Sequence, residues 1–295
     1  MKIYPNQFLG FNFKKLFLYY FYTKFEILKY FLMHVLPNRK FLKNNLKVKN
    51  SKKGKKVFIF GSGPSMNILD PKKILRLVDE EGYEVIAVNS FLYSNFGKSI
   101  TPNYMVFSDP IDFRDVPDNH PRIGRAIGGK EDKKKAINKS IPLIIPIQFY
   151  EQTKKDHGQV FYFNDCNDYF SGNIDLLKPR SYKTFTGMKA IASGIYMGYD
   201  EIYICGFDYS HFKNTVVNKD NQTILKFDHF YESKDRPNHI LPLRGSFGEH
   251  LYDCALAFIH HDKFKNFNII NLHQNSFIDS FPKNKNLNVY LDNKK

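Results

Sequence analysis

Glycine and short polar residues directly follow an apolar run near the start of the sequence, a pattern typical of nucleotide sites. Lys56–Phe60 is a short apolar strand pattern, and Gly61–Ser65, with the sequence GSGPS, comes next. Glycines allow a sharp turn and the close approach of backbone N–H groups to a phosphate, and Pro64 ends the strand. A helix predicted over Met66–Glu81 completes a strand, loop and helix unit that presents N–H groups to an anion.

The glycine loop matches neither of the two common phosphate-binding fingerprints. Met66 stands where G-x-G-x-x-G requires its last glycine, and no Gly-Lys-Ser/Thr follows as in a Walker loop. A tight turn between a strand and a helix is therefore the alternative interpretation of the loop.

Polar residues also follow two further predicted strands. Glu84–Val88 runs into Asn89 and Ser90, and Tyr104–Phe107 runs into Ser108–Pro110. The carboxyl ends of parallel strands meet at one edge of an open α/β sheet, where such folds build their sites. Together these strand ends predict a ligand site more specifically than any single one of them.

The same unit recurs in the second half of the chain. The strand Ile202–Cys205 ends in Gly206–His211, and the strand Asn268–Leu272 ends in His273–Ser276. Thr186 and Gly187 precede a predicted helix, Met188–Met197, and Thr186 is expected either to cap this helix or to hold a nucleotide at its N-terminus. Alternating strands and helices predict an α/β fold with a doubly wound, mostly parallel, Rossmann-like sheet.

Composition narrows the class of protein. The 295 residues carry a net charge of +15, which favours anionic partners. No RNP, zinc-finger or helix-turn-helix pattern accompanies that charge, so no nucleic-acid partner is predicted. The three cysteines form no C-x-x-C pair, which predicts neither disulfides nor a zinc site and fits a cytoplasmic compartment; Cys205 and Cys254 are expected in the core.

Residues 1–50 form a basic, aromatic N-terminal helix and linker ahead of a domain predicted over 51–295. Leu16–Leu36 is nearly long enough to span a bilayer, but Lys24, Glu26 and Lys29 lie within it. With the lysine-rich Arg39–Lys56 behind it, the segment has the pattern of a helix lying on an anionic membrane surface. A helix packed on the domain and a true membrane span are the alternatives.

The motifs GSGPSMNILD, VIAVNSF, FSDP and FTGMKAIASGIYMGYDEIYICGFDYS resemble, in order and spacing, the bacterial lipooligosaccharide sialyltransferases of glycosyltransferase family 42. The resemblance covers about Val57–Asn275. Related patterns occur in motility-accessory-factor glycosyltransferases and in proteins resembling 6-hydroxymethylpterin pyrophosphokinase. The resemblance implies a single-domain, glycosyltransferase-A-like variant of the fold with a lid at about 212–246.

The resemblance also implies an activity. It is inverting transfer of sialic acid, or a related nonulosonic acid, from a CMP-activated co-substrate to a lipooligosaccharide or capsule glycan, without a metal or another cofactor. The enzyme is expected at the inner face of the cytoplasmic membrane, with an oligomer possible. The alternatives are an ATP- and Mg²⁺-dependent pyrophosphokinase and a non-catalytic nucleotide- or glycan-binding protein.

Site residues carry over from the family position by position, with some departures. The family's asparagine after the third strand falls on Asp109, whose carboxylate accepts hydrogen bonds but donates none, and which favours the pyrophosphokinase slightly. A family serine matches Thr186, and an arginine falls on Lys183. The residues expected to bind the nucleotide sugar are Gly61, Ser62, Gly63, Ser65, Asn89, Ser90, Asp109, Thr186, Gly187, Gly206 and Asp208.

A histidine is expected to deprotonate the acceptor hydroxyl, because its pKa lies near 7. His250 is the first choice, and His239 and His211 are alternatives. Tyr209, Tyr231 and Lys183 are the remaining catalytic candidates, the tyrosines for the leaving phosphate. His260 and His261, on a helix predicted over Glu249–Lys263, are expected at the surface.

Overall fold

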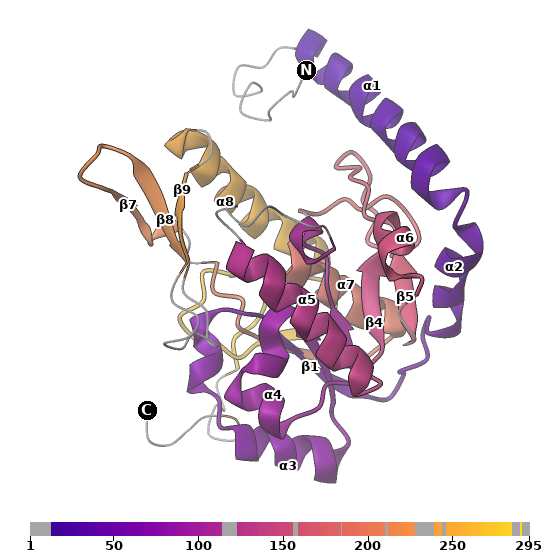
Figure 1. Cartoon of the computed structure of the whole chain (residues 1–295), viewed down its shortest axis with the longest axis vertical. Helices are drawn as coiled ribbons and strands as arrows, with labels where there is room; N and C mark the ends of the chain where they lie inside the picture. The colour runs from indigo at the N-terminus through magenta and orange to yellow at the C-terminus, as the bar shows by residue number, and fades with distance from the viewer. Residues whose placement is uncertain are drawn as a thin grey trace.

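The structure is a computed structural model that describes residues 13–113, 123–155, 159–183, 185–209, 212–227, 239–243, 246–284 and 290. For 13–16, 123–128, 226–227 and 239–242 it describes the backbone alone. Figure 1 shows a central sheet flanked by helices, with the N-terminal helices along one side of the molecule.

A seven-stranded parallel sheet forms the centre of the fold, in the order β10-β6-β1-β2-β3-β4-β5. This confirms the predicted α/β class and its doubly wound sheet. The strands at Lys56–Phe60 and Glu84–Val88 have the predicted bounds, and the three other predicted strands shift by a residue or two. The strands are β1 (Lys56–Phe60), β2 (Glu84–Val88), β3 (Tyr104–Val106), β4 (Leu143–Pro146), β5 (Val160–Phe163), β6 (Glu201–Cys205) and β10 (Ile269–Asn271).

Side chains of the central strands alternate between two apolar layers. In β1, Phe58 and Phe60 enter one core with residues of α3 (Pro71–Glu81) and α4 (Asn95–Ser99). Val57 and Ile59 enter the other core, with α7 (Thr186–Met197) and α8 (Phe247–His261). Both faces of the strands are buried, which explains their uninterrupted apolar sequences.

The helix predicted over Met66–Glu81 is divided in two. A 3₁₀ turn covers Pro64–Ile68, and α3 begins only at Pro71, with the Asp70 side chain accepting from the Lys72 N–H at 2.9 Å. Proline cannot donate within a helix and restricts the residue before it, so it is accommodated at the first helical position. The helices at Thr186 and Phe247 begin two residues earlier than predicted, the second with a capping box between Ser246 and Glu249.

The segment predicted as a lid contains a small antiparallel sheet separate from the main one. It comprises β7 (Thr215–Val217), β8 (Thr223–Phe227) and β9 (His239–Pro242) in that order. The strands extend away from the main sheet near the start of α8 (Figure 1). Their role as a lid stays a prediction.

The N-terminal segment folds as helices that reach the edge of the sheet. They are α1 (Phe13–Tyr30), a π-helical turn (Phe31–Val35), α2 (Arg39–Lys43) and a 3₁₀ turn (Asn44–Lys47). Phe41 of α2 stacks on Tyr150, with 4.4 Å between the ring centroids. The Asn45 side chain donates a hydrogen bond to the backbone carbonyl of Tyr162 in β5. Among the helices that the structure describes, none is both long and apolar enough to cross a bilayer.

The remaining helical elements are short or lie between strands. They are α5 (Ile123–Asn138), α6 (Tyr150–Thr153) and 3₁₀ turns at Asn89–Tyr93, Pro110–Asp112, Ile147–Phe149 and Asp262–Phe264.

The expectation that His260 and His261 lie at the surface is wrong. His261 is fully buried, its Nδ1 lies 2.7 Å from the Ala257 carbonyl oxygen, and burial lowers its pKa to about 4. His260 is 6% exposed, and its ring lies against Tyr169. α8 therefore stays packed on the domain up to its C-terminal residues, although the polar sequence there indicates a surface position. Cys205 is in the core as expected, whereas Cys254 is half-buried.

Glu84, at the start of β2, is a buried carboxylate that joins the linker before β1 to the sheet. It accepts hydrogen bonds from Lys52 at 2.9 Å, Lys55 at 2.6 Å and Tyr199. Burial alone would raise the pKa of Glu84, but these donors hold it below its usual value. The carboxylate therefore stabilises the fold in its charged form.

We predict that Glu84→Gln lowers the free energy of unfolding by about 2 kcal/mol at pH 7, because two lysines lose their partner. The difference from wild type is complete above the usual pKa of glutamate and disappears as the pH falls through the lower value in the folded state. Denaturant unfolding between pH 3 and pH 7 measures this difference. Glu80→Gln, which removes an exposed pair with Arg76, is the matched control, and we expect its effect to be far smaller than that of Glu84→Gln. Equal losses in both variants would contradict the assignment.

Candidate active site at the carboxyl edge of the sheet

The loop after β1 packs directly on the loop after β6. The N–H of Gly61 donates to the Cys205 carbonyl at 2.8 Å, and the N–H of Gly63 donates to the Gly206 carbonyl at 2.9 Å. The parallel pairing of β1 with β6 thus continues past the strand ends, and it holds the predicted glycine loop at the sheet edge.

Glycine is required in this contact for steric reasons. A Cβ on Gly61 would lie 2.3 Å from the Gly206 carbonyl oxygen, and one on Gly63 would lie 1.8 Å from Oδ2 of Asp208. Gly206 has a φ of +79°, in the left-handed region that favours glycine. Loop packing therefore explains these glycines without a ligand, and contact with a phosphate stays a prediction for them.

Ser65 and Asp208 bind the two loops to each other. The Ser65 hydroxyl donates to Oδ2 of Asp208 at 2.9 Å and accepts from the Gly206 N–H at 3.0 Å. The backbone N–H of Ser65 donates to the same carboxylate at 3.2 Å. Both side chains are buried and engaged within the loop pair, which gives them a role in shaping the site.

His273 is a member of this cluster that the sequence analysis did not select. It follows β10, and its Nδ1 lies 3.5 Å from Oδ1 of Asp208. Burial lowers the pKa of His273, while the charge of Asp208 acts in the opposite direction. The signal was available in the sequence, because His273 directly follows the predicted strand Asn268–Leu272, which ends at the same edge.

Asn89 has an unusual backbone at the end of β2. Its φ is +51°, and its Oδ1 is buried with no hydrogen-bond partner among the described residues. Left-handed conformations outside glycine and unpaired buried polar atoms both tend to occur at functional sites. Ser90 beside it is only 2% exposed.

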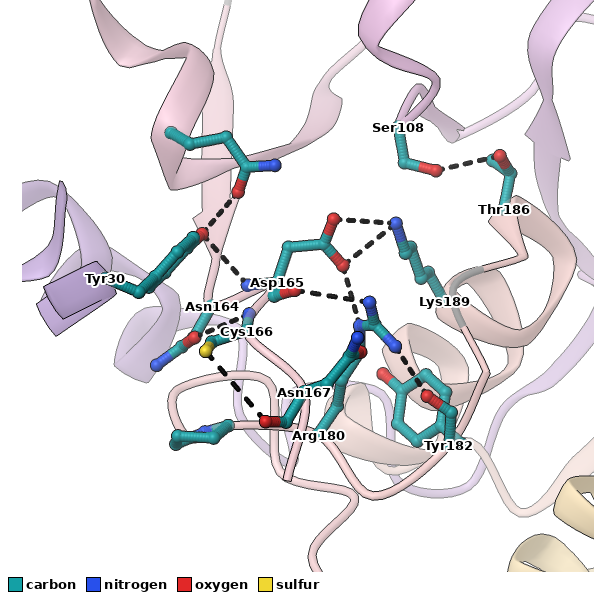
Figure 2. A network of polar contacts seen from close by, with 12 residues as sticks. Tyr30, Ser108, Asn164, Asp165, Cys166, Asn167, Arg180, Tyr182, Thr186 and Lys189 are labelled. Carbon is teal, nitrogen blue, oxygen red and sulfur yellow. Dashed lines mark hydrogen bonds and ion pairs between the residues drawn. The ribbon is translucent and has the colours of Figure 1, made fainter. Parts of the chain in front are cut away.

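The loop after β3 meets the N-terminus of α7. The hydroxyls of Ser108 and Thr186 lie 2.8 Å apart, as Figure 2 shows. Thr186 does not cap α7, because it is the first residue of the helix, and Phe185 at the N-cap position supplies no side-chain cap. A Cβ on Gly187 would lie 2.5 Å from the Phe207 ring. Asp109 instead caps a turn of its own, accepting from the Ile111 N–H at 3.2 Å.

A buried ion-pair network lies beside the N-terminus of α7 and was not predicted (Figure 2). Asp165, just after β5, binds Arg180 Nε at 2.7 Å and Lys189 Nζ at 2.9 Å. Lys189 is fully buried, and Arg180 is 2% exposed. The lone charge in the apolar helix sequence around Lys189 was the available signal, since a buried lysine requires a partner.

The charges in this network perturb one another strongly. Burial lowers the pKa of Lys189 to about 8, against the charge of Asp165. Burial alone would raise the pKa of Asp165, but Lys189 and Arg180 hold it below its usual range. The network therefore contains two cations and one anion in the protein interior, next to the turn that carries Thr186.

The candidate catalytic residues lie mostly on or near α8. His250 is half-buried in its first turn, and burial lowers its pKa against the charge of Asp253. Lys183, three residues before α7, binds Asp253 at 2.6 Å and so joins the His250 helix to that side of the sheet. Tyr209, with a φ of +47°, packs on Phe185 and on α8.

Several predicted residues fall outside the described part of the chain. These are Tyr231, His211 and the side chain of His239. Within the described residues, no group of three or more His, Cys, Asp or Glu side chains forms a candidate metal site.

No protein-family model matches the sequence, and no curated protein matches it significantly. Two solved structures resemble the fold. One is the MAf glycosyltransferase from Magnetospirillum magneticum AMB-1, with 13% identity and a TM-score of 0.47; the match covers 88% of this chain and 40% of that one. The other is the Campylobacter jejuni sialyltransferase CstII, solved with cytidine-5'-monophosphate, with 14% identity and a TM-score of 0.44; it covers 82% of this chain and 88% of that one.

This chain spans less than half the length of the Magnetospirillum protein. At these identities the likeness concerns the fold, and the chemistry is argued from the residues of this chain.

We predict that Gly63→Ala lowers the free energy of unfolding by about 2–4 kcal/mol, because the new methyl group meets the Asp208 carboxylate. Gly172→Ala is the matched control; its Cβ meets nothing within 4 Å, and we expect a change below about 0.5 kcal/mol. In an Asp208→Ala background the Gly63→Ala effect shrinks, because the clash has been removed. Denaturant unfolding of the four combinations measures the coupling, and strict additivity would contradict the contact.

Proposed function

We propose that the protein is a glycosyltransferase that moves sialic acid, or a related nonulosonic acid, from a CMP donor to a cell-surface glycan with inversion. The segments that carry the family resemblance support the proposal, because they lie together at one edge of the sheet. They are the ends of β1, β2, β3 and β6 and the start of α7. Residues scattered from Gly61 to Asp208 in the sequence thus line one candidate site.

The observation that carries the proposal is the unpaired side-chain oxygen of Asn89. An amide oxygen that is buried and unpaired within the protein, on a backbone with positive φ, favours a hydrogen-bond donor from outside the chain, either a ligand or an ordered water. A cytosine or ribose donor group would supply the missing hydrogen bond. The N–H groups at the start of α7, which its preceding residue does not cap, suit the phosphate of the same nucleotide.

The catalytic step needs a base for the acceptor hydroxyl and donors for the leaving CMP. His250 supplies the base, because its lowered pKa keeps the imidazole neutral at pH 7. The acceptor oxygen attacks the anomeric carbon as the bond to the CMP phosphate oxygen breaks, and His250 takes the proton. Lys183 and the Tyr209 hydroxyl are the candidates for stabilising the phosphate, which needs no metal if such donors are in place.

We predict that CMP raises the melting temperature of the protein in EDTA, because a ligand that binds only the folded state stabilises it. UDP, GDP and ATP, each with and without Mg²⁺, form the comparison panel. Asn89→Gly, which removes the amide but tolerates the positive φ, weakens CMP binding by about tenfold without lowering the melting temperature of the free protein. Stabilisation by ATP with Mg²⁺ alone would overturn the proposal in favour of a pyrophosphokinase.

We predict that His250→Ala lowers the transfer rate from CMP-N-acetylneuraminate by about 10²–10⁴-fold while CMP binding persists. The wild-type rate falls toward acid with a midpoint below the usual histidine value of about 6.5, because protonation removes the base. Rate measurements from pH 5 to pH 8 and calorimetric titration with CMP test both statements. A midpoint above 7, or full activity in the variant, would exclude His250 as the base.

A further inference from the structure

The N-terminal helix α1 has two faces with different partners. Lys24, on the flank of the helix, binds Asp168 at 2.7 Å, and Tyr30, on the face toward the domain, donates to Gln148 and accepts from the Asp165 N–H at 3.2 Å. Thr23, on the same face, is buried. The helix therefore has a fixed orientation on the protein surface.

The opposite face of α1 and its π-helical turn is apolar and exposed. Its side chains recur every three or four residues, the spacing of one helix face. Each of them is more than half exposed: Phe17 62%, Phe21 53%, Phe25 62%, Leu28 54% and Leu32 53%. A row of this kind spans about 20 Å along the helix and far exceeds the isolated apolar residues of an ordinary surface.

A strongly basic segment continues from this face. Between Glu26 and Asp70 the sequence has no acidic residue and ten basic ones: Lys29, Arg39, Lys40, Lys43, Lys47, Lys49, Lys52, Lys53, Lys55 and Lys56. The first five are exposed. They lie on α1, α2 and the turn after it, which follow one another along the same side of the molecule (Figure 1).

We propose that this face, from Phe17 to Lys47, docks the protein on an anionic lipid bilayer, with the apolar row of α1 inserted between headgroups and the exposed bases against lipid phosphates. The apolar row matches the boundary between headgroups and acyl chains, and the exposed bases match the anionic headgroups. A second copy of the chain fits less well, because a two-fold contact uses the same surface on both chains, and the segment between Glu26 and Asp70 has no acidic residue to meet the exposed bases. The helix is thus both packed on the domain and available to a membrane.

Sedimentation of the full chain with vesicles tests the proposal. We expect binding to vesicles of phosphatidylcholine with phosphatidylglycerol, and much weaker binding to phosphatidylcholine alone or at high salt. Phe21→Ser with Phe25→Ser lowers the partition coefficient by about tenfold or more, and so does Arg39→Gln with Lys40→Gln and Lys43→Gln. Phe267→Ser, which removes an exposed aromatic ring elsewhere, is the matched control and leaves binding unchanged.

The following outcomes decide whether this face binds a membrane. Equal sedimentation of wild type and both variants, or no sedimentation of wild type, would overturn the proposal. A wild-type dimer that the Phe21 and Phe25 changes dissociate, with no vesicle binding, would assign the face to a second copy instead. Melting temperatures within about 2 °C of wild type support it by showing that the substituted side chains are not part of the core. The variants are also titrated with CMP. Unchanged CMP binding would show that a loss of vesicle binding does not come from damage to the proposed nucleotide site.

Discussion

The close contact between the loops after β1 and β6 is the constraint on which the sheet edge depends. The two backbones approach so closely at Gly61, Gly63 and Gly206 that any side chain would collide with the other loop. Ser65 and Asp208 then fix the loops through three hydrogen bonds, and His273 lies against the same carboxylate. Because β1 lies inside the sheet and pairs with both β6 and β2, this contact also positions the neighbouring strand ends.

Asp165 connects the site to the rest of the molecule. Its carboxylate binds Lys189 of α7 and Arg180, while its N–H donates to Tyr30 of α1. Removing one partner from such a buried group leaves an uncompensated charge, which is strongly destabilising. The N-terminal helix, the start of α7 and the end of β5 are therefore held by one residue, and the helix has a defined place on the domain rather than a loose tether.

Much of the fold was predictable, because it rests on local patterns. Buried apolar runs gave β1 and β2 their bounds, and alternation with helices gave the parallel sheet. The sequence analysis explained the glycines after β1 by a phosphate, which stays a prediction, and did not foresee that they pack on the carbonyl of Gly206. That packing joins residues more than 140 positions apart, so no local pattern contains it.

The errors have similar causes. Pro71 delays α3 because the cap at Asp70 prevails over the longer helical pattern. His261 is buried because of its place on α8, which depends on how the helix lies on the sheet. Lys189 pairs with Asp165, 24 positions earlier in the sequence, and Arg180 reaches the same carboxylate from another loop. No local pattern predicts this ion-pair network, although the lone charge of Lys189 in an apolar helix indicated that a partner exists. The alternatives for the N-terminal segment were not exclusive, since one helix face packs on the domain while the other remains exposed.

A crystal structure of the protein with CMP tests the central claim most directly, because it locates the nucleotide. The account predicts the nucleotide at the carboxyl edge of the sheet, with the Asn89 amide about 3 Å from a ligand atom. It also predicts the phosphate at the backbone N–H groups of the glycine loop or of the first turn of α7. CMP bound elsewhere, with the Asn89 amide oxygen still unpaired, would contradict the assignment of this edge as the donor site.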